Sequence, residues 1–341
     1  MRSRVLDLVA CPSCGANLRV SEEALAEGDE LLEGSLACAG CAKTFAVRAG
    51  VPRLLPETVH PEATETSGRF ADSWATFDRI DEHYEKQFLG WIAPNEPEDF
   101  AGRVVLEGGC GKGRHSTLVA QWGAKDVIAT DLGSAVEVAF RNTRHLPNVH
   151  VVQADLLSLP VPPTSVDVAF SVGVLHHVTE PESAFRELVR RVKPGGKVMA
   201  WVYGRENNGW IVHGINPIRS AVTSRVPFPV VNAMSVGPAA LLWLASRGVY
   251  RPLSRGPMRR LGDRLFYRDY IEHLADFPFW ELHCIVADHL APGIAYYLRR
   301  EEFEGWFERA RLQSVQIGWH NQNSWRGTGV VPVGAADHDG R

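Results

Sequence analysis

The sequence predicts an α/β fold in which helices cover both faces of a mostly parallel sheet. Short β-branched runs alternate with helical segments between residues 104 and 203, as in right-handed βαβ units. Two further observations delimit this region. Paired cysteines lie near the N-terminus, and an arginine-rich block without the β-branched runs typical of strands follows residue 204.

Composition places the chain among ordinary globular proteins. Its 341 residues suffice for one large or two moderate domains with a small appendage. A net charge of −4 argues against a chain devoted wholly to nucleic acid. The charged first residues lack an apolar run behind them, so no signal peptide is expected. Two CxxC pairs then indicate metal binding rather than disulfides, and a cytoplasmic location is expected.

Changes in texture divide the chain into four parts. We expect a cysteine module at 1–57, a polar linker at 58–69, a sheet domain at 70–204 and 291–335, and a helical lid inserted at 205–290. An insertion after the fifth strand overhangs the carboxyl ends of the parallel strands. Sheets of this kind bind their ligands there.

Within the sheet domain each element has its own signal. Phe70, Trp74 and Phe77 recur at i, i+4 and i+7, which predicts a helix over 70–92. The β-branched runs predict strands at 104–106, 127–130, 149–153, 166–171 and 197–203, and later at 314–320 and 327–331.

A glycine-rich turn closes the first expected strand. Glu107 ends the strand, and the glycines of the turn are Gly108, Gly109, Gly111 and Gly113. Glycine allows positive φ and a close approach of the backbone to a ligand. The helix that follows would direct its N-terminus at the same place. The turn therefore predicts a nucleotide-like ligand.

Polar residues at the ends of the next strands fit such a ligand. Asp131 ends the second strand, where a carboxylate can accept hydrogen bonds from ribose hydroxyls. Asp155 follows the third strand and can take the amino proton of an adenine. Ser171 ends the fourth strand, shortly before His176 and His177. A Lys-Pro-Gly-Gly turn at 193–196 leads into the fifth strand.

With these motifs in this order, the chain resembles the class I S-adenosylmethionine-dependent methyltransferases. Among these it is similar to the methyltransferase type 11 family. The match covers about residues 100–203, with weaker support from 295–333. The glycine turn alone is weak evidence for this family, because NAD-binding folds use a similar turn. Asp155, the histidine pair and the Lys-Pro-Gly-Gly turn make the resemblance specific. It implies a Rossmann-like, seven-stranded, mostly parallel sheet and S-adenosyl-L-methionine as cofactor.

The resemblance also implies roles for the site residues. Glu107, Gly108, Gly109, Gly111 and Gly113 would face the methionine part of the cofactor, Asp131 the ribose, and Asp155 and Leu156 the adenine. Ser171 would offer backbone atoms to the amino group, and Leu132 would also bind the cofactor.

Methyl transfer is an in-line displacement at a sulfonium carbon, so the enzyme aligns donor and nucleophile and removes a proton where the acceptor needs it. His176 and His177 follow the fourth strand, close to the expected methyl group. They are candidates for a catalytic base, and the alternative is that they only shape the pocket. The fourth strand lacks both an Asn/Asp-Pro-Pro-aromatic tetrad and a Pro-Cys pair. The absence of these motifs argues against two reactions: methylation of the amino groups of nucleic-acid bases, and methylation of pyrimidines at C5.

The cysteine module has the spacing of a structural metal site. Cys11, Cys14, Cys38 and Cys41 form two CxxC pairs, which suit a closed tetrahedral structural Zn²⁺. The segment 45–56 resembles small zinc-ribbon proteins that partner methyltransferases, and some ribosomal RNA methyltransferases carry a fused ribbon. Residues 1–57 hold six basic and eight acidic residues, a net −2. This charge favours a structural or protein-docking ribbon over RNA binding.

The inserted block is basic and partly apolar. Residues 205–275 hold ten arginines, Arg255 among them, against four acidic residues, a net +6. These could form a solvated face of a lid, or a patch for an anionic substrate such as a phosphorylated sugar, a lipid carrier or RNA. Prolines in the uncharged run 226–246 argue against a spanning helix. The run is expected to be lid core or a peripheral membrane contact.

Candidates for an acceptor pocket come later in the chain. The residues are His283, Asp288, His289, Tyr296 and Tyr297, which could equally form a hydrogen-bonded core.

Three functional hypotheses follow. The first is methyl transfer from S-adenosyl-L-methionine to a small-molecule or carrier-linked acceptor, at oxygen before carbon or nitrogen. The second is methylation of a ribosomal or transfer RNA base. The third is a non-catalytic scaffold. The intact glycine turn and the carboxylates of Asp131 and Asp155 argue against it.

Overall fold

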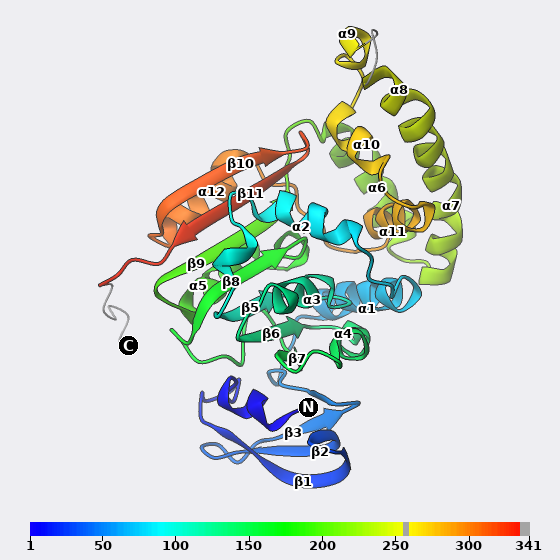
Figure 1. Cartoon of the computed structure of the whole chain (residues 1–341). Helices are drawn as coiled ribbons and strands as arrows, with labels where there is room; N and C mark the ends of the chain where they lie inside the picture. The colour runs from blue at the N-terminus through cyan, green and yellow to red at the C-terminus, as the bar shows by residue number, and fades with distance from the viewer. Residues whose placement is uncertain (255–258, 335–341) are drawn as a thin grey trace.

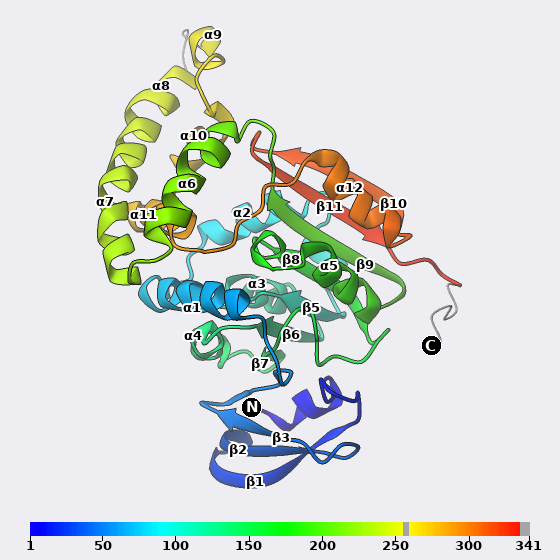
Figure 2. The same cartoon turned by 180° about the vertical axis from the view of Figure 1, so that it is seen from behind.

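The computed structural model describes residues 1–254 and 259–334. Arg255 and residue 335, the expected end of the sheet domain, lie outside the described residues. The cysteine module and the helical lid lie at opposite ends of the molecule, and the sheet domain lies between them (Figures 1 and 2).

The central sheet has seven strands, as the sequence and its resemblance predicted. They are β5 (Val104–Gly108), β6 (Asp126–Asp131), β7 (Val149–Gln153), β8 (Val166–Val172), β9 (Val192–Tyr203), β10 (Gln313–His320) and β11 (Ser324–Val330). Their order is β10-β11-β9-β8-β5-β6-β7. β5 to β9 are parallel, whereas β11 runs antiparallel to β9 and β10. The chain reverses direction across the sheet between β5 and β8, where doubly wound sheets bind ligands.

Helices cover both faces of this sheet. They are α2 (His83–Ile92), α3 (Arg114–Gln121), α4 (Ala135–Thr143), α5 (Pro181–Arg191) and α12 (Arg300–Arg309). Adjacent residues of a strand point to opposite faces. Val105 accordingly joins the core under α2, α3 and α4, and Leu106 joins the core under α5 and α12.

The Lys-Pro-Gly-Gly turn is a bulge within β9. Val166 pairs with Val192, but Val168, two residues on, pairs with Lys197. The extra residues turn through Gly195, whose φ is 80°. The N–H of Gly195 donates to Val331 O at 2.8 Å, so the bulge also holds the segment after β11.

The cysteine module is a four-stranded antiparallel sheet docked on the edge strand β7. It comprises η1 (Ser3–Asp7), β1 (Leu18–Glu27), β2 (Glu30–Cys38), β3 (Thr44–Arg48) and β4 (Val51–Pro52). The N–H of Leu54 donates to Gln153 O, and the N–H of Ala10 donates to Pro160 O, each at 2.9 Å. Apolar residues of the module belong to the same core as β7. The module therefore covers an edge that would otherwise be open to strand pairing.

The expected linker differs from the structure. Helix α1 (Pro61–Thr76) begins nine residues before the predicted start at Phe70. His60 is extended and Pro61 stands in the first turn, where its missing N–H costs nothing. Burial of Thr66 holds the polar half of the helix in place, and periodicity of apolar residues could not reveal this contact.

The lid is helical, with no strand among its described residues. Its elements are η4 (Ile211–Ile215), α6 (Asn216–Ile218), η5 (Arg219–Thr223), α7 (Phe228–Ala245), η6 (Ser246–Tyr250), α8 (Arg251–Ser254), α9 (Arg259–Gly262), α10 (Arg268–Leu274) and α11 (Phe279–Leu290). α7 lies at the outer edge of the lid and packs against α11 (Figure 2).

The expectation that prolines interrupt the segment 226–246 is wrong. Pro227 and Pro229 stand at the start of α7, where proline is tolerated, and the helix continues through Pro238. Continuous helical structure over Phe228–Ser254 is long and apolar enough to cross a membrane by length and composition alone. Only 22% of its most apolar window is buried.

Candidate functional site

A cavity of about 530 Å³ lies between the carboxyl ends of the strands and the lid. Its volume is in the range of about 300–1,000 Å³ that is usual for ligand pockets. Helix α1, the glycine turn, the ends of β6 to β9 and the lid all contribute to its wall. Expected site residues on the wall are Gly109, Gly111, Asp131, Leu132, Asp155, Leu156 and His177.

The glycine turn is held against the end of β6. The N–H groups of Gly109 and Cys110 both donate to Thr130 O at 2.8 Å. Gly109 and Gly111 have φ of 82° and 51°. A Cβ on Gly109 would lie 2.3 Å from Val174, so the turn requires glycine for space as well as conformation. Helix α3 then starts with its N-terminus at the turn.

Asp131 has the geometry expected of a ribose ligand. Its Oδ2 accepts the N–H of Gly111 at 2.9 Å, and its Oδ1 accepts the N–H of Gly133 at 3.0 Å. Each carboxylate oxygen has a further lone pair. Burial raises the pKa of Asp131, which the two N–H groups partly offset. The carboxylate can therefore accept two more hydrogen bonds from a ligand in the cavity.

Asp155 lies on the same wall. Its Oδ1 accepts the N–H of Leu157 at 2.9 Å, and burial raises the pKa of its carboxyl. Its neighbour Leu156 adds an apolar surface. A hydrogen-bond acceptor beside an apolar side chain suits an adenine ring.

Four expected cofactor residues lie behind this wall: Glu107, Gly108, Gly113 and Ser171. The Ser171 hydroxyl donates to Gly108 O at 2.8 Å, within the protein. A Cβ on Gly113 would lie 3.0 Å from Thr143 Cγ2 on helix α4. These contacts support the turn from behind.

Glu107 turns its carboxyl group away from the cavity, toward α3. The Ser116 hydroxyl donates to it, and His115 Nδ1 lies 3.1 Å away. Burial raises the pKa of Glu107 to about 8 and lowers the pKa of His115 well below its usual value. At neutral pH both groups are therefore uncharged, and the carboxyl proton is donated to His115 Nδ1. That Glu107 faces the methionine part of the cofactor stays a prediction.

Of the two expected bases, only His177 reaches the cavity. Its Nδ1 lies 2.6 Å from Ile294 O, so Nδ1 carries the proton and Nε2 keeps a lone pair. Burial lowers the pKa of His177 to about 3. His176 is fully buried, with its ring 3.9 Å from that of Tyr203, and is a packing residue.

Helix α1 forms a wall that the sequence did not predict. Its residues on the cavity are Ala63, Thr66, Ser67, Phe70 and Trp74, and His60 before the helix also lines it. A Cβ on Gly111 would lie 2.8 Å from Trp74 Nε1, so the indole sits directly on the glycine turn. The Phe70 ring lies 4.8 Å from that of His177. The spacing of Phe70 and Trp74 indicated a packed helix face, but not what it packs on.

A buried ionic cluster ties the lid to the glycine turn. Lys112 is only 1% exposed, and its Nζ donates to Phe77 O at 2.7 Å and to the Tyr84 hydroxyl at 2.9 Å. The Tyr84 hydroxyl in turn donates to Glu281 of α11. Arg114 Nη1 lies 3.9 Å from Glu281 Oε1. The Glu281 carboxylate thus compensates the charge of Arg114 directly and that of Lys112 through the Tyr84 hydroxyl.

Asp288 is a second lid carboxylate on the cavity wall. Its Oδ1 accepts the hydroxyl of Ser73 on α1 at 2.7 Å. Burial raises the pKa of Asp288 to about 6, so it exchanges its proton near neutral pH. His289 and Tyr297 also line the cavity, as the sequence allowed.

The other two acceptor candidates lie elsewhere. Tyr296 is 45% exposed, and His283 hydrogen-bonds Asn232 O at 2.8 Å.

The charge of the wall favours a cationic ligand. Its lysine, arginine, aspartate and glutamate residues are Lys112, Arg114, Asp131, Asp155, Glu281 and Asp288, two positive against four negative, a formal −2. No arginine of the described part of the lid lines the cavity. An anionic acceptor inside the cavity is therefore disfavoured, whereas a sulfonium fits.

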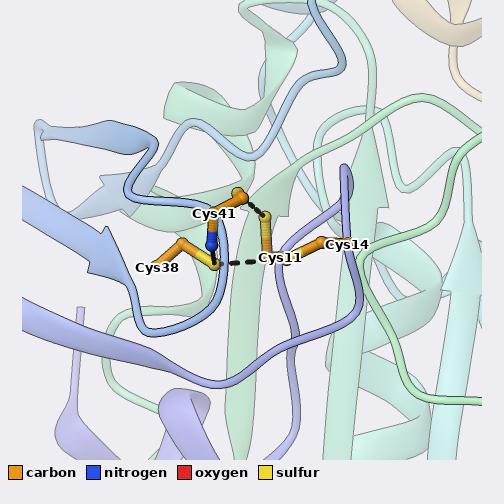
Figure 3. A group of neighbouring side chains, drawn as sticks. All are labelled: Cys11, Cys14, Cys38 and Cys41. Carbon is orange, nitrogen blue, oxygen red and sulfur yellow. Dashed lines mark hydrogen bonds between the residues drawn. The ribbon is translucent and has the colours of Figure 1, made fainter.

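The four cysteines converge as their spacing predicted (Figure 3). Their ligand atoms all lie within 4.8 Å of one another. Cys14 and Cys38 Sγ are 3.4 Å apart, and Cys11 and Cys41 Sγ are 3.7 Å apart. A tetrahedral zinc with Zn–S bonds of about 2.3 Å places its sulfurs about 3.8 Å apart. The cluster has the donor set and size for such an ion.

Comparison with known proteins agrees with this site. Residues 106–200 match the family described as a methyltransferase domain. A tRNA U34 carboxymethyltransferase of Methylococcus capsulatus is 31% identical over 49% of this chain and 49% of its own length. A "probable S-adenosylmethionine-dependent methyltransferase" of Mycobacterium tuberculosis is 39% identical over 28% of this chain and 34% of its own.

Among solved structures, the complex of the Haloferax volcanii Trm112 methyltransferase activator with a methyltransferase is 16% identical. The match covers 77% of this chain and 98% of that chain, with a TM-score of 0.45.

The match over residues 106–200 and the relatives support an S-adenosylmethionine-dependent methyltransferase domain, which confirms the prediction. The cysteine module is confirmed as a fold consistent with a zinc ribbon. The chain spans about half or less of the length of these two curated relatives.

The buried pair of Glu107 and His115 predicts a pH-dependent stability. The folded state holds the Glu107 proton up to about pH 8, whereas an ordinary glutamate releases it near pH 4.5. The folded state thus binds more protons between these values. The contribution is fully present below about pH 4.5 and is lost as pH rises toward 8, by up to about 1.4 kcal/mol per unit.

Glu107→Gln keeps a neutral donor and should flatten this slope. Urea unfolding of the parent and the variant between about pH 4.5 and 8 would measure the slope of the unfolding free energy against pH. His115 is present in both proteins, so its contribution cancels in the comparison. Identical slopes would show that Glu107 is already ionised in the folded protein.

Proposed function

We propose that this protein transfers the methyl group of S-adenosyl-L-methionine to an amphiphilic small molecule or carrier-linked acceptor, at a hydroxyl oxygen. The observation that carries the proposal is a single cavity that joins the glycine turn to an apolar lid and contains Asp288. When bound, S-adenosyl-L-methionine supplies an electrophilic methyl group on a sulfonium.

The cofactor would be held by the turn and the two strand-end carboxylates. Asp131 would accept ribose hydroxyls through its free lone pairs, and Asp155 with Leu156 would hold the adenine. The negative wall would attract the sulfonium. Leu132 lies beside Asp131 and would pack on the ribose.

Asp288 is the proposed base. A base that works near neutral pH needs a pKa close to it. The pKa of Asp288 is about 6, whereas burial leaves the pKa of His177 at about 3. Asp288 would take the proton of the acceptor hydroxyl. His177 Nε2 would accept a hydrogen bond and so orient the acceptor.

The apolar part of the acceptor would lie toward the lid. Aromatic and aliphatic side chains dominate that end of the wall, among them Trp201, Tyr203, Leu242, Phe266 and Ile285. Such a wall stabilises an apolar group by burial.

An RNA base is the second candidate acceptor, because one relative is named as a tRNA U34 carboxymethyltransferase. Two observations oppose it. The cavity wall has a net negative formal charge, and residues 1–57 are also net negative.

We also propose that Cys11, Cys14, Cys38 and Cys41 hold a structural Zn²⁺. Reduced thiolates of this kind fit a cytoplasmic location. One face of the ribbon already docks on the same chain, through Leu54 on β7 and through Ala10 on the loop after β7. A partner protein would have to use another face.

Cofactor affinity tests the enzyme hypothesis against the scaffold. We expect Asp131→Ala to weaken S-adenosylhomocysteine binding about 100-fold, since two hydrogen bonds to a charged group contribute roughly 1.5 kcal/mol each. Calorimetry measures it. Asp72→Ala, which removes an exposed carboxylate of α1, serves as the control and should bind normally. A parent protein without affinity for the ligand would support the scaffold.

Asp288→Asn should lower kcat/KM by about 10²–10⁴-fold and leave S-adenosylhomocysteine affinity unchanged. The parent rate should fall about tenfold per pH unit below about pH 6, because the base must be unprotonated. The variant should lack this limb. Transfer of a labelled methyl group to 4-nonylphenol and to total tRNA would be measured in parallel. Label in tRNA, or equal rates for variant and parent, would contradict the proposal.

Removal of zinc should weaken cofactor binding as well as unfold the ribbon. The ribbon shares a core with the sheet, and it holds the loop after Asp155 through Ala10 and Pro160. Chelation at moderate temperature should therefore lower the melting temperature and the S-adenosylhomocysteine affinity together. Loss of ribbon structure with normal affinity would show that the two parts are independent.

A further inference from the structure

The surface of the lid is unusually apolar. Fourteen large apolar side chains are exposed in the described part of the chain, and eleven of them belong to residues 205–290. They are Trp210, Ile218, Val222, Val230, Met234, Val236, Leu241, Leu244, Val249, Phe266 and Phe279. An exposed apolar surface of this kind marks a contact with a partner or a membrane.

Helix α7 carries the most regular part of this surface. Val230, Ala233, Met234, Gly237, Leu241 and Leu244 recur at steps of three, four and seven and share one side of the helix; we call this set the lid stripe. All six are exposed, with Leu241 at 71% and Leu244 at 59%.

The opposite side of α7 is also apolar, but it is packed. Val231 and Ala239 are fully buried, and α7 packs against α11 of the lid. A helix that is apolar on all sides is normally enclosed by protein or lipid. Because one side already packs on α11, a spanning position would break the lid core. A position on a lipid surface would not.

The charges around α7 favour an anionic surface. No ionisable residue lies between 226 and 246, and the residues that flank this segment are Arg225 and Arg247. Arg225 is exposed and forms no ion pair with any described residue. Arg251 follows in α8, where its Nη2 lies 3.7 Å from Asp276 Oδ1, and Arg264 lies after α9. Apolar residues with flanking arginines suit a headgroup region of anionic lipids.

A second copy of the chain fits this face less well. A symmetric contact through the lid stripe would bring the same arginines of both copies together. Lipid headgroups would instead supply the opposite charge.

Helix α7, which carries the lid stripe, also borders the cavity. Pro238 and Leu242 of α7 line it, as do Phe266 and Tyr267. Phe266 is 56% exposed, so it contributes to the outer surface and to the cavity wall. One helix therefore borders both solvent and the acceptor end of the cavity.

We propose that the lid stripe lies on an anionic lipid surface and brings the acceptor end of the cavity to the bilayer. The acceptor class is then a membrane-dissolved amphiphile with a reactive hydroxyl, a point that rests on the proposed methyl transfer. The arginines contact headgroup phosphates, and Leu241 and Leu244 enter the apolar layer.

Vesicle cosedimentation of the full chain tests this directly. The parent should bind vesicles of phosphatidylcholine with phosphatidylglycerol, and bind vesicles of phosphatidylcholine alone at least tenfold more weakly. Leu241→Glu/Leu244→Glu should reduce binding to the anionic vesicles at least tenfold. Leu25→Glu is the matched control, because Leu25 is 52% exposed on β1 at the opposite end of the molecule.

Calorimetry with S-adenosylhomocysteine on every variant shows that the fold is intact and tests the cofactor site separately. Vesicle binding without cofactor binding would leave the docking surface standing and overturn only the proposed function. Three outcomes would overturn the docking proposal. These are a parent that does not bind anionic vesicles, equal binding by the double variant, and a parent dimer that the double variant abolishes without any vesicle binding.

Discussion

The attachment of the glycine turn to the end of β6 is the interaction on which the site depends. Thr130 O accepts two backbone N–H groups, from Gly109 and Cys110, and the Asp131 carboxylate accepts a third from Gly111. These bonds draw the backbone across the switch point of the sheet. They leave the outward lone pairs of Asp131 for a ligand. Any side chain at Gly109 would collide with Val174 and push the turn out of place.

The rest of the molecule supports this turn from three sides. Behind it, Glu107 and His115 form a neutral buried pair, so no uncompensated charge lies beneath the cofactor site. Above it, Glu281 of the lid compensates Lys112 and Arg114, and removing that carboxylate would leave two buried cations. At the edge of the sheet, the ribbon holds the loop that carries Asp155.

Local signals were sufficient for the sheet, the turn and the cysteine cluster. Strand alternation, glycine spacing and CxxC spacing each depend on residues close in sequence. Asp288 and Ser73 meet across 215 residues, a contact that no periodicity can reveal. Helix α1 was missed in its polar half for the same reason. The contacts of Glu107 with Ser116 and His115 also depend on the packing of α3, which its place in the motif does not reveal.

We propose that the donor site on the sheet faces an apolar acceptor site under the lid. A structure of the full chain with S-adenosylhomocysteine tests this account most directly. It should show both ribose hydroxyls within hydrogen-bond distance of Asp131, the adenine beside Asp155, and the thioether sulfur facing open space that leads to Asp288. A ligand outside this cavity, or a sulfur walled off from Asp288, would contradict it.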